Sequence, residues 1–217
     1  MNQKKFDRLF QHYIRYFGAE EEPMIYHTIV DEPGALHIDV VSLAPTKDRP
    51  FRVLATIGAS DHAMRPKPHD LSDRNEYVTF VPADWDLDAP EYRWIVNLLQ
   101  MVAQYPHEAE TMITYSHTLD MTAVMEELHS EDFNMCGAGL LFPQVCDDTN
   151  VLRCRTSFFE TVTILHMMPL TRAEMDEINR RRQEGVIADG GPDWSDMFYP
   201  EDDEAYAAMP FLCARKR

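Results

Sequence analysis

Segments with strand character occur in groups along this chain, and segments with helical periodicity lie only near its start, its middle and its end. A doubly wound parallel sheet alternates strands and helices regularly, and this order does not. The sequence therefore predicts an α+β fold with a central mixed, mostly antiparallel sheet flanked by helices. Strands are expected over residues 24–30, 36–43, 51–57, 77–81, 111–119, 137–142 and 161–168, and helices over 4–17, 90–105 and 172–185.

The middle helix is the clearest helical segment within the domain. Pro90 lies near its start, and Pro106 is expected to end it, because proline disrupts a helix interior. The face towards the core is expected to consist of Trp94, Ile95, Leu98, Leu99, Val102 and Tyr105.

The other two helices carry residues typical of helix ends. Gly18 follows the amphipathic run of the first helix and is expected to end it. Thr171 and Glu174 have the spacing of a capping box, which opens a helix that runs to Gly185.

The composition changes after this last helix. Residues 188–217 combine glycine and proline with the acidic run 201–204 and a basic end. We predict one domain over residues 1–187 and an acidic C-terminal tail over 188–217. The tail is expected to pack in part, through Trp194, Phe198, Tyr199 and Phe211.

The chain is strongly acidic, with a formal charge of -17 from 37 acidic and 20 basic residues. Contacts to phosphates need clustered lysine and arginine, so this excess disfavours a nucleic-acid partner. A negative surface speeds encounter with basic partners, and it also keeps a protein soluble. Both explanations of the charge stay open.

Several features indicate a cytoplasmic protein. No apolar run is long enough to cross a membrane, and the first residues lack the continuous apolar core of a signal peptide. The cysteines form no CxxC pair, which favours reduced thiols over disulfides or structural zinc. They are Cys136, Cys146, Cys154 and Cys213.

Catalytic and cofactor motifs are weak. The GxG at Gly137 and Gly139 lacks the third glycine of a dinucleotide-binding turn and enters a predicted strand. The sequence around Ser60 lacks the second glycine of GxSxG, so a turn is the better interpretation. We therefore predict no enzymatic activity and no cofactor.

Histidines support one alternative, a metal-dependent hydrolase. His37 and Asp39 flank one residue, which places both side chains on one face of a strand, and His107 and His117 could add ligands. The HExxH arrangement is absent. Hydrogen-bonded histidines without metal are the simpler explanation, and we predict no metal.

The order of several segments resembles the suppressor of fused family. The series spans roughly residues 24 to 187, and its specificity lies in the order and not in any single motif. It consists of GALHIDVV (34–41), RVLATIGASDHAM (52–64), VPADW (81–85), EYRWIVNLLQMVAQYPH (91–107), YSHTL (115–119), GLLFP (139–143) and TVTILHMMPLTRAEM (161–175).

This resemblance implies a mixed α+β domain that binds a protein. The animal member regulates Hedgehog signalling negatively and clamps an extended peptide, which joins sheet edges as an added strand. The chain resembles the shorter bacterial type, which has only the first of the two animal domains. Bacterial relatives include immunity proteins, so the resemblance and the acidity together suggest a non-enzymatic binder of a basic toxin.

A binding surface is expected where turns of the family-like segments converge. Loops at element ends carry function more often than strand interiors. Trp85 and Tyr105 could instead seal the core, as buried aromatic residues usually do. The candidate binding residues are Ser60, Asp61, Trp85, Tyr105, His107 and His117.

Overall fold

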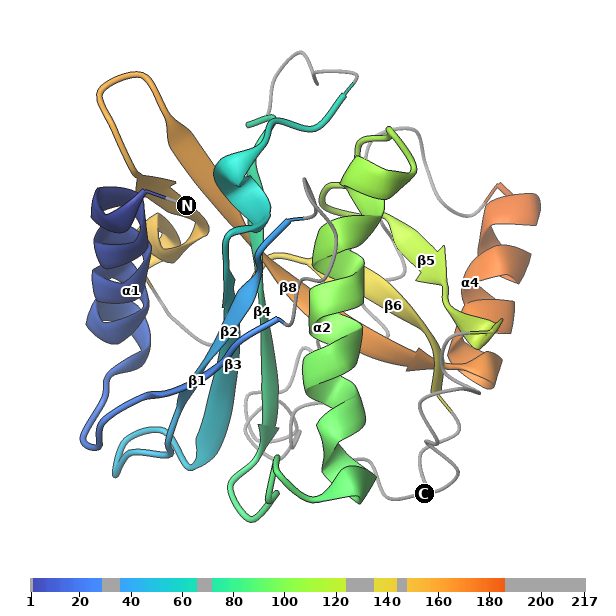
Figure 1. Cartoon of the computed structure of the whole chain (residues 1–217). Coiled ribbons are helices and arrows are strands. Elements are labelled where there is room, and N and C mark those ends of the chain that lie inside the picture. Colours follow the sequence, from blue (N-terminus) through green and yellow to red (C-terminus); the bar gives the residue numbers. More distant parts are fainter. Residues whose placement is uncertain (1, 29–35, 66–71, 124–134, 144–147, 186–217) are drawn as a thin grey trace.

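An eight-stranded sheet with helices on both faces forms the part of the chain that the computed structural model describes, residues 2–28, 36–65, 72–123, 135–143 and 148–185 (Figure 1). Its strands are β1 (Met24–Tyr26), β2 (Asp39–Leu43), β3 (Phe51–Ile57), β4 (Asn75–Pro82), β5 (Thr118–Asp120), β6 (Met135–Leu141), β7 (Arg153–Arg155) and β8 (Thr161–Thr171). The α-helices are α1 (Gln3–Phe17), α2 (Pro90–Glu108) and α4 (Arg172–Gln183), and short 3-10 turns occur at η1 (Ala59–Asp61) and η2 (Thr149–Leu152).

The strand order is β1-β2-β3-β4-β8-β6-β5, and β7 pairs with the beginning of β8. Strands β4 and β8 run parallel, whereas the other described pairs are antiparallel. The parallel pair is possible because the long connection between β4 and β8 contains α2 and strands β5, β6 and β7. The predicted α+β class, with a mixed and mostly antiparallel sheet, is confirmed.

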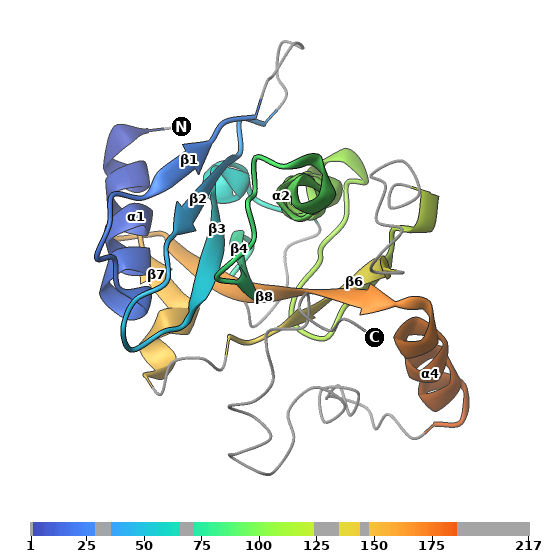
Figure 2. The same ribbon diagram turned by 90° about the horizontal axis from the view of Figure 1, so that it is seen from below.

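Helices cover both faces of the sheet. Seen from below, α2 lies on one side, and α1 and α4 lie on the other (Figure 2). Strand β8 contributes to every layer, because its side chains alternate between the two faces. Leu165 and Met167 join the core under α2, whereas Ile164 packs in the α1 core and Leu170 in the α4 core.

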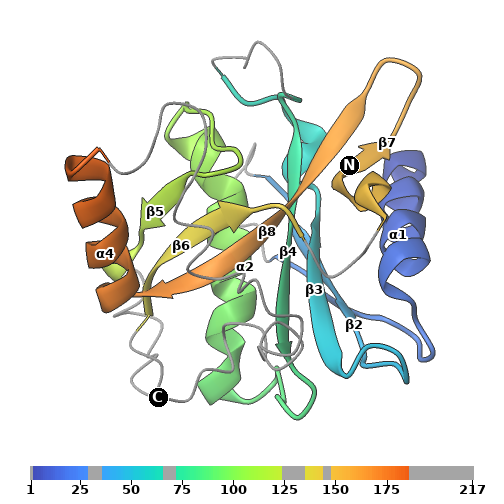
Figure 3. The same cartoon turned by 180° about the vertical axis from the view of Figure 1, so that it is seen from behind.

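Strand β8 crosses the middle of the molecule, with α1 near its beginning and α4 at its end (Figure 3). It extends beyond the predicted end at Met168 to Thr171. His166 is buried in this strand and contacts the ring of Phe80 at 4.7 Å between centroids. Burial lowers the pKa of His166 to about 3, so the imidazole is neutral at neutral pH and packs as part of the core.

Helix α2 continues beyond Pro106, which the sequence predicted as its end. The proline lies in the last turn, where its ring and missing amide hydrogen disturb less of the helix than in the interior. Pro106 is buried, one helical turn after the core residue Val102, whereas Tyr105 is 37% exposed. The prediction that Tyr105 belongs to the core face is therefore wrong.

Short edge strands differ most from the sequence prediction. Strand β1 ends at Tyr26, and the segment predicted as a strand over 111–119 contributes only the short β5. Strand β7 has three residues and was not predicted. Strands of three residues are too short to show the alternation of apolar and polar residues that reveals a strand in a sequence. Pairing with a neighbouring strand stabilises them instead.

Among the described helices, none is long and apolar enough to cross a bilayer. The predicted acidic tail over 188–217 lies outside the described residues.

The capping box at the start of α4 is present as predicted. The Thr171 side chain accepts from the Glu174 amide, and the Glu174 carboxylate accepts from the Thr171 amide at 2.8 Å.

We expect Thr171→Ala to lower the free energy of unfolding by about 1 kcal/mol, because amide groups of the first turn lose a partner. Thr171→Ser retains the hydroxyl and should lose less. Urea denaturation of the three proteins measures this, and equal losses in both variants would contradict a capping role.

Candidate functional site

A buried carboxylate organises the end of the sheet at which β3 and β4 meet η1. Glu76 on β4 has no solvent exposure. Its Oε1 accepts from the Gly58 amide at 3.0 Å, from the Ser60 amide at 2.9 Å and from the Ser60 hydroxyl at 2.6 Å. Its Oε2 accepts from the Thr56 hydroxyl at 2.6 Å. Burial raises the pKa of Glu76, and these hydrogen bonds oppose the rise only in part.

The turn that holds this carboxylate requires glycine at position 58. Gly58 has a φ of 124°, which L side chains rarely adopt. A Cβ atom there would lie 2.2 Å from the His37 carbonyl oxygen. Gly58 therefore lets the chain turn sharply after β3, pass close to the start of β2 and aim its amide at Glu76.

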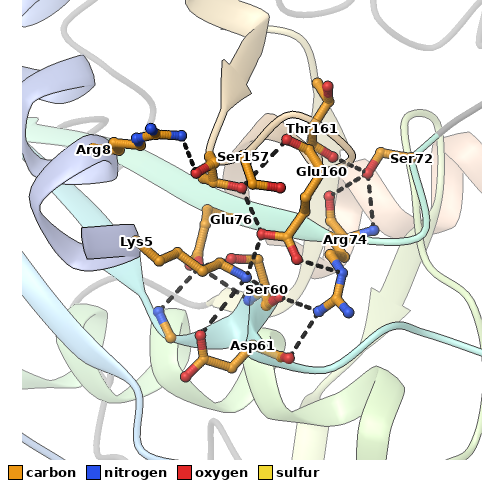
Figure 4. Close-up of polar contacts among 12 residues, drawn as sticks. Lys5, Arg8, Ser60, Asp61, Ser72, Arg74, Glu76, Ser157, Glu160 and Thr161 are labelled. Atoms are coloured by element: carbon orange, nitrogen blue, oxygen red, sulfur yellow. Dashed lines mark hydrogen bonds and ion pairs between the residues drawn. The ribbon is translucent and has the colours of Figure 1, made fainter. Parts of the chain in front are cut away.

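A network of charged side chains lies around this turn (Figure 4). Lys5 of α1 lies 3.0 Å from a Glu160 carboxylate oxygen and 3.7 Å from one of Asp61. Arg74 binds the other Glu160 oxygen at 3.1 Å and donates to the carbonyl oxygens of Ser60 and Asp61. The network thus joins α1, η1, the start of β4 and the turn between β7 and β8.

Glu160 is held ionised within this network. Partial burial acts to raise the pKa of Glu160, but hydrogen bonds from Thr156 and Lys5 outweigh it and lower the pKa. The network contains two basic side chains, Lys5 and Arg74, and two carboxylates, Glu160 and Asp61. It is therefore close to charge balance in spite of the acidity of the whole chain.

Two hollows meet at η1. One has a volume of about 830 Å³ and extends towards the end of α2, where it is lined by Arg65, Pro106 and His107. The other has a volume of about 600 Å³ and extends over α1 to the β7–β8 turn. Asp61 and His62 line both hollows, so η1 is the ridge between them.

Three of the predicted binding residues come together at this ridge. Asp61 faces both hollows, and His107 lines the larger one. The His107 Nε2 atom lies 3.1 Å from the Ala59 carbonyl oxygen, and burial lowers the pKa of His107. Ser60 has no exposure, because its hydroxyl and amide both bind Glu76. Ser60 therefore holds the turn to Glu76.

The other predicted binding residues do not line these hollows. Trp85 is 7% exposed and stacks on Tyr92 at 4.9 Å between ring centroids, so the alternative that it seals the core describes its position. Tyr105 is exposed on α2. The His117 Nδ1 atom lies 3.2 Å from the amide nitrogen of Thr114 and 3.1 Å from its carbonyl oxygen, where it closes a local turn before β5.

The histidine cluster differs from the one that the hydrolase alternative needs. His37 and Asp39 do come together, with 2.9 Å between Nε2 and Oδ1. The third member is His27, whose Nδ1 lies 2.8 Å from the same Asp39 oxygen. Neither His107 nor His117 belongs to this cluster, which is the one group with metal-ligand geometry among the described residues.

Sequence reasoning missed Lys5, Arg74 and Glu160, which lie far apart along the chain. No local pattern links them, because the pairing of β4 with β8 brings Arg74 to Glu160, and the packing of α1 against β3 and β7 adds Lys5. The exposed aromatic pair Phe158 and Phe159 was also missed, although two adjacent phenylalanines between turn-forming residues are visible in the sequence.

A family model for the suppressor of fused protein (SUFU) matches residues 34–197, more than half of the chain. The chain therefore belongs to the suppressor of fused family. No curated protein sequence matches it.

Solved structures share this fold. A SUFU homologue from Neisseria gonorrhoeae FA 1090 has a TM-score of 0.54 at 13% identity, over 86% of this chain and 91% of that chain. A chain of the Sufu–Fu complex has a TM-score of 0.53 at 13% identity, over 80% of this chain and 77% of that chain. Drosophila Suppressor of Fused has a TM-score of 0.52 at 15% identity, over 87% of this chain but only 47% of its own length.

The buried carboxylate leads to a pH prediction. Because the pKa of Glu76 is raised in the folded state, the folded protein binds this proton more tightly than the unfolded chain, whose value is near 4.5. Wild-type stability should therefore fall, relative to Glu76→Gln, as the pH rises from 4.5 through the folded-state pKa.

Glu76→Gln suits this comparison because it retains an acceptor for the Gly58 and Ser60 amides, and the Thr56 hydroxyl can turn to accept from the new amide. Urea denaturation of both proteins between about pH 4.5 and about pH 8 gives the difference in unfolding free energy. If this difference does not change with pH, or if the wild type gains stability relative to Glu76→Gln as the pH rises, burial does not dominate the pKa of Glu76.

Proposed function

We propose that this chain is a protein-binding module that acts without catalysis, and that its partner docks on the surface around η1. The observation that carries the proposal is that Asp61 and His62 line two adjacent hollows, to which α1, α2 and the β7–β8 turn all contribute. A surface assembled from several elements and supported by a buried hydrogen-bonded carboxylate is preorganised, which lowers the entropic cost of binding. The sheet behind it supplies the rigid scaffold.

Exposed aromatic side chains stand beside this surface. Phe158 and Phe159 are 77% and 94% exposed, in the turn that also carries Glu160. Phe158 lines the smaller hollow, and the Arg155 guanidinium lies 5.2 Å from its ring centroid. Exposed aromatic side chains next to charged groups are typical of the residues that dominate binding energy at interfaces.

Absence of catalysis is supported by how the polar groups at this end are used. Lys5, Arg74 and Glu160 are engaged with one another, and Ser60 is buried against Glu76. Within the described residues, this serine has a carboxylate partner but no histidine base, and it has no access to solvent. The arrangement suits recognition better than nucleophilic chemistry.

The class of partner follows from the family. A structural neighbour is a chain of a complex between Sufu and Fu, so a protein or an extended peptide is the proposed partner here. A narrower form of the proposal is an immunity protein in the cytoplasm that neutralises a basic toxin. The net charge of -17 supports it, because opposite charges accelerate association.

The docking surface is tested by replacing the aromatic pair. We expect Phe158→Ser combined with Phe159→Ser to weaken partner binding about tenfold or more, since each ring is a candidate anchor. Both side chains are exposed, so the fold and the thermal unfolding temperature should be retained. The measurement is a pull-down from the source organism with wild-type bait, followed by titration of the identified partner with both proteins.

The matched control is Met24→Ser, which removes another exposed apolar side chain, on the edge strand β1. It should bind the partner as the wild type does. If Met24→Ser loses binding and the phenylalanine variant does not, the partner uses the sheet edge and the docking surface proposed here is wrong. Failure of the wild-type bait to retain any protein reproducibly would contradict the binding function itself.

The immunity role is tested by co-expression. A toxic protein encoded beside this chain should stop growth when it is produced alone, and growth should recover when the chain is produced with it. Recovery should require direct binding, so the phenylalanine double variant should protect less well than Met24→Ser. Continued growth arrest in the presence of soluble wild-type chain would rule out immunity against that toxin while leaving protein binding intact.

A further inference from the structure

Three potential metal ligands, His27, His37 and Asp39, meet where β1 ends and β2 begins. The Asp39 Oδ1 atom lies 2.8 Å from His27 Nδ1 and 2.9 Å from His37 Nε2. All three ligand atoms lie within 4.8 Å of one another. The aspartate side chain is 6% exposed, whereas the two histidine side chains are 66% and 47% exposed. The cluster is therefore buried on the side of the aspartate and open to solvent on the side of the two histidines.

The pairing of the two strands explains why His27 meets Asp39. In the antiparallel register Tyr26 lies opposite Val40. His27 follows Tyr26, and Asp39 precedes Val40 on the antiparallel neighbour, so the side chains of His27 and Asp39 are next to each other. Their contact follows from the register of the sheet.

The alternation of side chains places His37 on the same face. His37 lies two residues before Asp39, the first residue of β2, and its Nε2 atom reaches the Asp39 carboxylate on the same side of the chain. Val41, two residues further on, packs in the core on the α1 face, as does Ile25, two residues before His27. All three potential ligands therefore point to one face of the sheet.

The backbone at this site is held in place by α2. Gln100 of α2 donates from Nε2 to the Thr28 hydroxyl at 2.9 Å and to the Ile38 carbonyl oxygen at 3.2 Å. The Thr28 hydroxyl donates to the same carbonyl oxygen. Thr28 and Ile38 each adjoin ligand residues, so the ligand-bearing segments are fixed relative to each other before any ion binds.

We propose that His27 Nδ1, His37 Nε2 and Asp39 Oδ1 bind one divalent transition-metal ion of the zinc type. Imidazole nitrogens and a carboxylate oxygen are ligands that suit Zn²⁺, and three of them leave a coordination position for water or a partner's side chain. A tetrahedral site with bonds of about 2.0 to 2.1 Å has ligand atoms about 3.3 Å apart. Each of the two distances from Asp39 Oδ1 to a histidine nitrogen needs to lengthen by only about half an ångström to reach that spacing.

The competing explanation is a pair of histidines that donate hydrogen bonds to one carboxylate oxygen without a metal. Both states use the same contacts, but they differ in what they need. Hydrogen bonding needs a proton on each of the two ring nitrogens, whereas metal binding needs both nitrogens deprotonated. A metal ion needs the open side of the cluster for its remaining ligand, whereas a hydrogen-bonded pair of histidines has no such need.

The site is distinct from the docking surface around η1, and its ligands are not among the residues that line the two hollows. A bound ion would connect the edge strand β1 to β2 at the point where the three residues of β1 end. We therefore expect Zn²⁺ to raise the thermal unfolding temperature, because an ion that binds only the folded state shifts the equilibrium towards it.

The test uses the full chain without an affinity tag, stripped with chelator and titrated with Zn²⁺ by calorimetry. We expect one ion per chain. His27→Ala and His37→Ala should each weaken binding about tenfold or more, because each removes one of three ligands. The matched control is His62→Ala, which removes a histidine outside the cluster and should bind Zn²⁺ as the wild type does.

Substitution with Co²⁺ gives a second readout, since visible absorption reports its coordination directly. The wild type should show a Co²⁺ spectrum that Zn²⁺ abolishes, and His27→Ala should lose it. His27 is largely exposed, so this variant is expected to remain folded, and circular dichroism is the measurement that checks it. Absence of Zn²⁺ binding by the wild type, or equal affinity in wild type, His27→Ala and His37→Ala, would overturn the proposal.

Discussion

The fully buried carboxylate of Glu76 is the interaction on which the proposed docking surface depends. A carboxylate without water is unstable unless donors surround it, and here four hydrogen bonds from three residues do so. Those donors lie on β3 and on the turn that follows it, so the carboxylate fastens that turn to β4. Gly58 makes the geometry possible, because a side chain at this position would collide with the start of β2.

The same turn determines what lies on the surface above it. With Ser60 directed inward, Asp61 and His62 form the ridge between the two hollows. Lys5 and Arg74 then bind carbonyl oxygens of the turn and the Glu160 carboxylate, which adds α1 and the β7–β8 turn to the same surface. A rigid surface of mixed charge with exposed aromatic side chains is suited to recognising a protein, which agrees with membership of the suppressor of fused family.

The fold class and the long elements could be predicted because their signals are local. Strand β3 has the predicted bounds, and the capping box at Thr171 marks the start of α4. The position of Tyr105 could not be predicted in this way. Its place in the helical pattern resembles that of a core residue, yet Pro106 occupies the buried position in the last turn. Which side chain is covered depends on where the sheet lies beneath the helix, and periodicity does not contain that information.

The sequence by itself determined the α+β class, the order of the long strands and helices, the end of α1, the start of α4 and the likeness to a family, since each rests on neighbouring residues or on their order. It also predicted that the side chains of His37 and Asp39 lie on the same side of the chain, and they do meet, although His37 lies just before β2. Only the tertiary structure decided that His27 and not His107 joins them, that Ser60 points inward, and that Lys5, Arg74 and Glu160 meet. The physical reason is that strand register and helix packing bring together residues far apart in the chain, and these contacts depend on how the whole core closes.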